Sequence, residues 1–344
     1  LQGIGGSMIF ATGIAILTAV YPEEERGKVI GINIAVTYTA IALGPSLGGF
    51  LTAHLGWRSI FGFTVPFGAI GLLLSILGLK IEEKRAPVLR FDYPGAVIYG
   101  LSVFLLIYPP SLLVKGIGIL LFLLFLLWER RARDPILDIN LLKENRVFLY
   151  SSLSSFLLYT STFATGFLLS FYLQFIKGLG PQTAGLYILA RRISQAVISP
   201  SAGRTSDRIE PVYIATLGVG IAIIGLVFLF NFRIDTGILY ILITLIILGL
   251  GFGLFSAPNT SAIMGSVSKE NYGIASALNA TVRVVGQAMS MGVATAVIGL
   301  ILGPVRITPE RFSRFLQAMR STFAIFIVVG ILALFFSIRR GRLR

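Results

Sequence analysis

The feature that most constrains this chain is a series of long apolar segments separated by short polar loops. Hydrophobic residues make up 55% of the 344 residues and charged residues only 13%, which is not the balance of a soluble domain. A run of about 20 apolar residues can cross a bilayer as a helix. The chain is therefore predicted to be an all-α, polytopic membrane protein. We expect about eleven membrane segments, at residues 1–20, 28–53, 58–80, 94–108, 112–128, 147–175, 182–202, 211–231, 237–258, 273–302 and 319–338.

Basic residues are distributed unequally between the predicted loops. Of the 29 Lys and Arg residues, 18 lie on the side that carries the C-terminus and eight on the opposite side. Because loops rich in Lys and Arg remain in the cytoplasm, we expect a multi-pass protein of the plasma membrane with a cytoplasmic C-terminus. A net charge of +14 would suggest nucleic acid in a soluble protein, but here the basic residues flank apolar segments, so no nucleic-acid partner is expected.

One loop on the opposite side, at residues 303–320, departs from this distribution because it holds four basic residues. Thr308 and Pro309 can start a helix there. Phe312, Phe315 and neighbouring apolar residues then fall on one helical face. This pattern predicts a short interfacial helix lying on the outer surface of the membrane.

The residue types leave little room for catalytic chemistry. The chain has one histidine, His54, and no cysteine, so a metal site, a cofactor site or an enzyme active site is not expected. All 15 acidic residues lie in predicted loops or at helix ends. Because a proton-coupled exporter of cations usually needs an acid within the membrane, these residues alone give no sign of proton coupling.

An internal repeat relates residues 3–35 to residues 249–281 at a constant offset of 246. Gly27 matches Gly273, and Asn33 matches Asn279. Two parallel halves of this kind are how one large class of transporters is built. The offset predicts about 100 residues before Leu1, enough for three more helices at roughly 20 residues each. We therefore expect about fourteen helices in the intact protein.

The segment Gly27 to Ala53 carries a stripe of small residues at four-residue spacing, which permits close helix packing. Within it, AxxxGPxxGG resembles the motif GxxxGPxxGG of the drug:proton antiporters of the major facilitator superfamily, with Ala40 at the first glycine position. The resemblance implies a packing seam that keeps the cavity from leaking. The matching residues are Ala40, Gly44, Pro45, Gly48 and Gly49.

Other segments resemble the fourteen-helix branch of the same family. FDYPGA at residues 91–96 is similar to the entry of the first extra helix, and GRTSDRIEP at 203–211 is similar to the signature loop GxxxDRxG, with Glu210 where glycine is usual. The resemblance implies a monomer with two pseudo-symmetric bundles and two extra helices. It also implies proton-driven export of hydrophobic compounds, with small-molecule substrate, protons and lipid bilayer as partners. The expected domains are residues 1–80 (first bundle, three helices missing), 81–146 (two linker helices and a cytoplasmic segment) and 147–344 (second bundle).

Two groups of residues are candidates for function. Gly203, Asp207 and Arg208 lie at a helix-to-loop junction, where Asp207 can face a helix N-terminus, and are predicted to form a conformational latch. Three arginines near the middle of membrane helices are costly there and usually face a cavity or a partner. These are Arg283 and the adjacent pair Arg191 and Arg192. We predict that Arg283 and one member of this pair face the central cavity and attract an anionic group. The candidate substrate-binding residues are Arg191, Arg192, Arg283, Asn279, Gln287, Tyr159 and Asn259.

Two alternatives to multidrug efflux remain open. The only intramembrane charges are positive, which would also suit an exporter of an anionic or zwitterionic metabolite. The second alternative is a nonfunctional transporter fragment, because three helices of the first bundle are expected to be missing.

Overall fold

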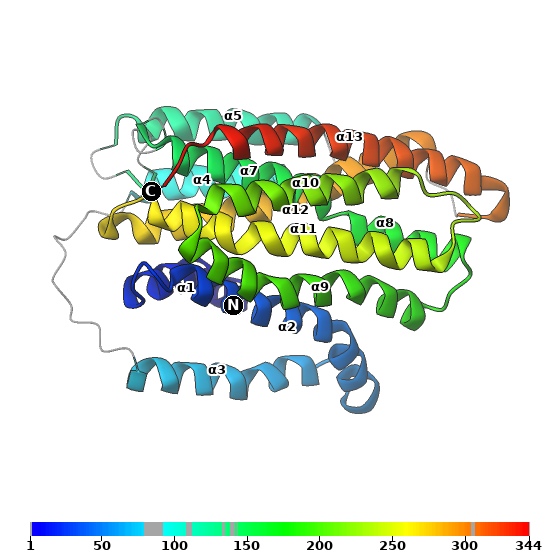
Figure 1. Cartoon of the computed structure of the whole chain (residues 1–344), viewed down its shortest axis with the longest axis horizontal. Coiled ribbons are helices and arrows are strands. Elements are labelled where there is room, and N and C mark those ends of the chain that lie inside the picture. The colour runs from blue at the N-terminus through cyan, green and yellow to red at the C-terminus, as the bar shows by residue number, and fades with distance from the viewer. Residues whose placement is uncertain are drawn as a thin grey trace.

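The computed structural model describes residues 2–78, 92–107, 112–132, 135–137, 142, 144–303 and 307–343. Every regular element in these residues is helical, and most of the helices run roughly along one common direction (Figure 1). The long helices are α1 (Gln2–Val20), α2 (Arg26–Leu55), α3 (Ser59–Gly78), α4 (Tyr93–Ile107), α5 (Leu112–Glu129), α7 (Arg146–Thr162), α9 (Pro181–Arg208), α10 (Pro211–Phe230), α11 (Ile238–Gly265), α12 (Tyr272–Ile301) and α13 (Phe312–Arg339). The predicted all-α, polytopic fold is confirmed.

The membrane spans follow from helix length and apolarity. Eight spans in the described residues are long and apolar enough to cross a membrane, and α4 and α5 provide two shorter apolar helices. One of the eight is composite: α7 continues through α8 (Thr165–Phe171) into a π-helical turn, Tyr172–Ile176. The helix α9 is less apolar, because Arg191, Arg192 and Gln195 interrupt it, yet it lies against both α2 and α11. It therefore belongs to the same bundle.

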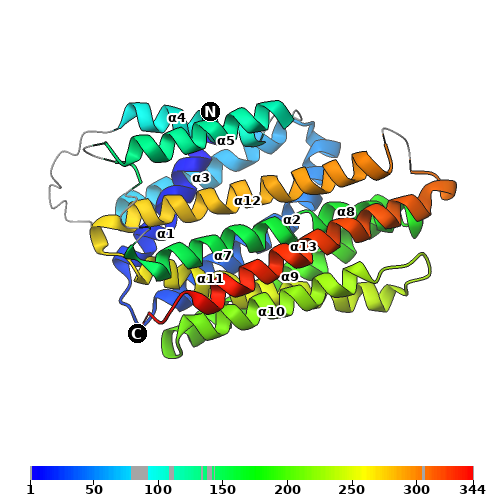
Figure 2. The same cartoon turned by 90° about the horizontal axis from the view of Figure 1, so that it is seen from above.

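The packing is densest around α9, α10 and α11. A buried core at the end away from the C-terminus joins α8, α10, α11 and α13, and a second core near the middle joins α2, α7, α10 and α11. Within the described residues, α1 packs mainly against α12, and α2 packs mainly against α9. Figure 2 shows α4 and α5 side by side at one edge of the molecule and α10 at the opposite edge. The first part of the chain thus contacts the later part at two places, where α1 packs against α12 and where α2 packs against α9.

The prediction of a separate interfacial helix near residue 312 is wrong. The helix α13 is continuous from Phe312 to Arg339. Its first turns are part of the protein interior, because Phe315, Leu316 and Met319 are buried in the core shared with α8, α10 and α11. The apolar face was identified correctly, but it packs against protein. A stripe of apolar residues has the same sequence pattern whichever apolar partner covers it.

Candidate functional site

Arg191 lies close to the middle of α9 and is buried. Its Nη1 donates a hydrogen bond to the carbonyl oxygen of Thr162 at 3.0 Å and another to the hydroxyl of Thr165. These acceptors are available because α7 ends at Thr162, which leaves the last carbonyl groups of the helix without intrahelical partners. The guanidinium also lies over the ring of Phe252, at 5.8 Å from its centroid. Arg191 therefore stabilises the break between α7 and α8.

Arg192 contacts a different helix. Its guanidinium lies over the ring of Tyr38 in α2, at 5.4 Å from the centroid. Adjacent residues on a helix point about 100° apart, so the Arg192 side chain leaves α9 in a different direction from that of Arg191. Tyr38 is buried and packs edge-on against Phe252, with ring centroids 6.3 Å apart. Tyr159 of α7 packs against the same phenylalanine at 5.0 Å.

Arg283 of α12 completes the group. Its guanidinium lies over the ring of Phe10 in α1, at 4.8 Å from the centroid. The Tyr159 hydroxyl interacts electrostatically with Tyr38, Arg283 and Arg192. Six helices, α1, α2, α7, α9, α11 and α12, therefore converge here. We call Arg192, Arg283, Tyr38 and Tyr159 the arginine–tyrosine cluster.

The arginine–tyrosine cluster lies deep in the bundle. Arg192 is about 16 Å along α9 from Pro181, and Arg283 is about 16 Å along α12 from Tyr272, at 1.5 Å per residue. Each distance is about half of a roughly 30 Å hydrocarbon core. Within the described residues, the one direct ion pair is Arg26–Glu23, so no described carboxylate contacts Arg192 or Arg283. The cluster thus carries two positive charges near mid-membrane depth.

Gln195 is a residue that the sequence analysis missed. It is fully buried, and neither atom of its side-chain amide has a hydrogen-bond partner among the described residues. It follows Arg191 by one helical turn on the same face of α9. A buried amide without partners is costly, which marks this face of α9 as a place that a polar group could fill. The signal in the sequence was its four-residue spacing from Arg191.

The other predicted polar residues separate into two groups. Asn279 and Gln287 are half-buried on α12, one turn before and one turn after Arg283, and so share its face. Asn259 lies elsewhere, near the end of α11. Its side-chain oxygen accepts a hydrogen bond at 2.7 Å from Arg340, a fully buried residue just after α13. The structure therefore assigns Asn259 to the attachment of the C-terminal segment instead of the cluster.

The predicted latch residue Asp207 contacts the N-terminus of α2. One carboxylate oxygen accepts a hydrogen bond from the backbone N–H of Gly27 at 2.7 Å, and the other accepts one from Lys28 at 2.9 Å. The first N–H groups of a helix lack intrahelical partners and carry partial positive charge, so a carboxylate is favourable there. Arg208, by contrast, is exposed at the end of α9. Asp207 thus ties the end of α9 to the start of α2.

Glycines allow this close approach. A Cβ atom at Gly203 would collide with the carbonyl oxygen of Gly27, and one at Gly31 would collide with the carbonyl oxygen of Ser199. The backbones of α2 and α9 are therefore in direct contact near the end that carries Asp207. A side chain at Gly203 or Gly27 would force the two helices apart.

The packing seam predicted on α2 stays a prediction, because no described atom contacts its glycines. No described atom lies within 4 Å of a Cβ built at Gly44, Gly48 or Gly49, and Ala40 is exposed. The side chain of Pro45 falls outside the described residues. Among the described residues, the seam with α9 is instead at Gly27 and Gly31. The closest contact between α2 and α9 lies near the start of α2, as expected for two straight helices that cross and touch over one part of their length.

Comparisons with known proteins agree with this fold. A profile of the Major Facilitator Superfamily matches residues 1–291. The riboflavin transporter RibZ of Clostridioides difficile is 33% identical over 293 residues, which are 82% of this chain and 63% of RibZ. The multidrug resistance protein Stp of Mycobacterium tuberculosis is 29% identical over 322 residues, which are 88% of this chain and 57% of Stp.

Two further proteins extend the comparison. The tetracenomycin C resistance and export protein of Streptomyces glaucescens is 26% identical over 316 residues, covering 88% of this chain and 57% of that protein. Among solved structures, the human organic anion transporter MFSD10 has a TM-score of 0.62 at 18% identity, covering 95% of this chain and 67% of that one. The chain spans less than two thirds of the length of RibZ, Stp and the tetracenomycin exporter. On the match over residues 1–291, the chain belongs to the Major Facilitator Superfamily.

Proposed function

We propose that the intact protein is a secondary active transporter of the fourteen-helix branch that exports hydrophobic or amphipathic compounds by proton antiport. It acts as a monomer in the plasma membrane, with a cytoplasmic C-terminus. Relatives named for multidrug resistance and for tetracenomycin C export support the direction and the substrate class. Proton coupling rests on the family resemblance, because the 15 acidic residues lie in loops or at helix ends.

The observation that carries the proposal is the position of the arginine–tyrosine cluster. We propose domains at residues 1–80 and 147–344, with a linker at 81–146. Tyr38 then comes from the first domain, and Tyr159, Arg192 and Arg283 come from the second. A compound bound at this cluster contacts both domains at about half the depth of the membrane. That is the place at which binding can select between two relative orientations of the domains.

Alternating access also needs contacts that form in one orientation and break in the other. The Asp207 hydrogen bonds to α2 and the glycine contact between Gly203 and Gly27 are such contacts, because they join the two proposed domains at one end. We propose that they close the cytoplasmic end. Opening that end requires both hydrogen bonds to break.

The proposal is tested with efflux of fluorescent aromatic dyes from cells that express the full-length gene. Replacing both cluster tyrosines, Tyr38→Ala with Tyr159→Ala, should reduce efflux at least tenfold at unchanged expression, because the aromatic contacts of a bound dye are lost. Tyr213→Ala, an exposed tyrosine on α10, is the matched control. An uncoupler should abolish efflux by the unmodified protein. Efflux that survives both the double replacement and the uncoupler would refute the proposal.

A second candidate is an exporter of an anionic or zwitterionic metabolite. It is favoured by one observation, that Arg192 and Arg283 face aromatic rings at mid-membrane depth without a described carboxylate in contact. Arg192→Gln should then lower transport of organic anions about tenfold and leave cationic dyes unaffected. Arg58→Gln, which removes a charge that lies beside Trp57, serves as the control. The same substrate profile before and after Arg192→Gln would exclude this candidate.

A further inference from the structure

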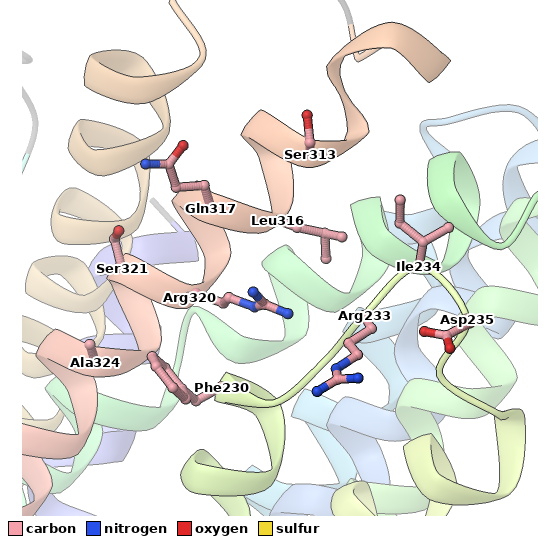
Figure 3. Close-up of a pocket in the computed structure, with 10 residues that line it drawn as sticks. All are labelled: Phe230, Arg233, Ile234, Asp235, Ser313, Leu316, Gln317, Arg320, Ser321 and Ala324. Atoms are coloured by element: carbon pink, nitrogen blue, oxygen red, sulfur yellow. The ribbon is translucent and has the colours of Figure 1, made fainter.

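A pocket of about 630 Å³ lies at the end of the bundle opposite the C-terminus, between the α10–α11 loop and α13 (Figure 3). Arg233 and Ile234 line it from the loop, and Arg320 and Leu316 line it from α13. Figure 3 shows the Arg320 guanidinium extending from α13 toward the loop, and the Arg233 side chain leaving the loop beside it. The pocket lies at the opposite end of the helical bundle from Asp207. None of its lining residues belongs to the arginine–tyrosine cluster.

The loop wall of the pocket is held in place by several contacts. The Tyr172 hydroxyl donates a hydrogen bond to the carbonyl oxygen of Arg233, and Lys177 donates one to the carbonyl oxygen of Ile234, each at 2.6 Å. Phe232 is buried in the core between them. Arg320 donates a hydrogen bond to the Phe232 carbonyl oxygen at 3.1 Å, which links the two walls. The loop backbone is therefore held in place beside α13, whereas the Arg233 and Arg320 side chains are exposed and can reach a ligand.

The pocket carries unneutralised positive charge. No described carboxylate lies within 4.0 Å of a basic nitrogen of Arg233 or Arg320, and Asp235 is the single acid among the described lining residues. Arg320 uses one N–H on Phe232, so its other donors and those of Arg233 can bind a ligand. Ser313, Gln317 and Ser321 add neutral polar groups along one face of α13. A pair of arginines with neutral donors suits a phosphate group.

Part of the lining of this pocket is apolar. Phe230, the last residue of α10, lines it. Val227 precedes Phe230 by one turn and is 39% exposed, and Val328 lies further along α13 and is 59% exposed. Figure 2 shows α10 at an edge of the molecule with α13 beside it. Val227 precedes Arg233 by six residues and Val328 follows Arg320 by eight, so both valines lie deeper along the membrane-spanning helices than the arginines and would face lipid.

We propose that this pocket binds the phosphate group of a membrane phospholipid between Arg233 and Arg320, with an acyl chain along Val227 and Val328. Free phosphate offers the same chemistry to the arginines, but it would leave the apolar track unused. A phospholipid carries its phosphate at the membrane surface and its acyl chains in the interior. The two guanidinium groups near the end of an apolar span, with exposed valines deeper along the helices, match this order.

The test uses the full chain purified in detergent and titrated with phosphatidylglycerol, with bound lipid counted by native mass spectrometry. Replacing both pocket arginines, Arg233→Gln with Arg320→Gln, should weaken lipid binding at least about tenfold, the effect of one lost charge-assisted hydrogen bond. The matched control is Arg311→Gln with Arg314→Gln, which removes the same charge from the same end of the protein but from outside the pocket. The control should bind lipid within about twofold of the unmodified chain.

A single replacement guards against loss of folding. Arg233→Gln leaves the Arg320–Phe232 hydrogen bond intact, so this variant should keep its thermal unfolding transition and still bind lipid more weakly. Inorganic phosphate is the second probe and should fail to displace the lipid. Equal weakening in the control pair would overturn the proposal, because binding would then follow net charge. Displacement of the lipid by inorganic phosphate would overturn the assignment to a phospholipid.

Discussion

Replacing Asp207 with alanine is the most direct test of how the two halves of the chain are held together. The carboxylate accepts hydrogen bonds from the backbone N–H groups of Gly27 and Lys28, at 2.7 and 2.9 Å. Asp207→Ala removes both acceptors and leaves the glycine contact between α2 and α9 unchanged. The variant therefore separates the electrostatic contribution to this contact from the contribution of packing.

The size of the effect follows from these two bonds. A hydrogen bond to a charged group contributes about 1.5–3 kcal/mol. Asp207 is half-buried, so the freed N–H groups can bind water once α2 and α9 separate, which reduces the loss. We take about 2–4 kcal/mol for the pair, less than the sum of two full contributions. Such a change shifts the ratio of the joined to the separated arrangement of α2 and α9 by about 30-fold to 1000-fold.

The assay is a distance measurement across the contact in the full-length protein in proteoliposomes. These 344 residues hold no cysteine, so spin labels can be placed at single introduced cysteines, one replacing Glu24 before α2 and one replacing Arg204 on α9, after any cysteine elsewhere in the full-length protein is replaced by serine. Asp207→Ala should transfer most of the distance distribution to longer values. Glu270→Ala, which removes an exposed acidic residue, should leave the distribution unchanged. Identical distributions for Asp207→Ala and the unmodified protein would show that these hydrogen bonds do not hold α9 to α2.

Three further predictions concern packing and buried charge. Gly203→Ala should lower the free energy of unfolding of the chain by about 1–3 kcal/mol in detergent denaturation, because its Cβ collides with the Gly27 backbone. Gly48→Leu should change the same quantity by no more than about 0.5 kcal/mol, because no described atom lies near that position; a larger loss would restore the packing seam at this glycine. Asn259→Leu should cost about 3 kcal/mol, because it removes an acceptor from the buried guanidinium of Arg340; an unchanged thermal unfolding transition would contradict this.

The positions of the intramembrane arginines could be predicted from the sequence, because helix rise and the cost of a buried charge depend only on residue spacing. The angle of about 100° between adjacent residues on a helix explains why the side chains of Arg191 and Arg192 leave α9 in different directions. The structure places Arg191 on Thr162 at the end of α7 and Arg192 over Tyr38 of α2. The identity of each partner could not be predicted, because it depends on which helices flank α9.

The differences between the predicted and the observed contacts have a common physical cause. Small-residue stripes, apolar stripes and polar residues are properties of one helix, whereas packing is a property of a pair. The glycine stripe of α2 is long, and its crossing with α9 selects Gly27 and Gly31 for contact and leaves Gly48 open. Asn259 was predicted as a substrate residue because it is an amide at the end of a predicted membrane helix, whereas its hydrogen-bond partner, Arg340, lies in the C-terminal segment. Only the fold brings these two side chains together.

The latch and the arginine–tyrosine cluster lie on the same pair of helices, which suggests how binding and opening are coupled. Arg192 and Asp207 are about 22 Å apart along α9, at 1.5 Å per residue, and Tyr38 and Gly27 are their respective contacts on α2. A compound that inserts between Arg192 and Tyr38 changes the separation of α2 and α9 at one point, while Asp207 fixes it at another. Coupling between two sites is reciprocal. A substrate that favours separation of α2 and α9 must therefore weaken the Asp207 hydrogen bonds. Conversely, breaking those bonds must strengthen the binding of that substrate. The factor is limited by the free energy of the latch, so Asp207→Ala should raise substrate affinity by no more than the 30-fold to 1000-fold estimated for the latch itself.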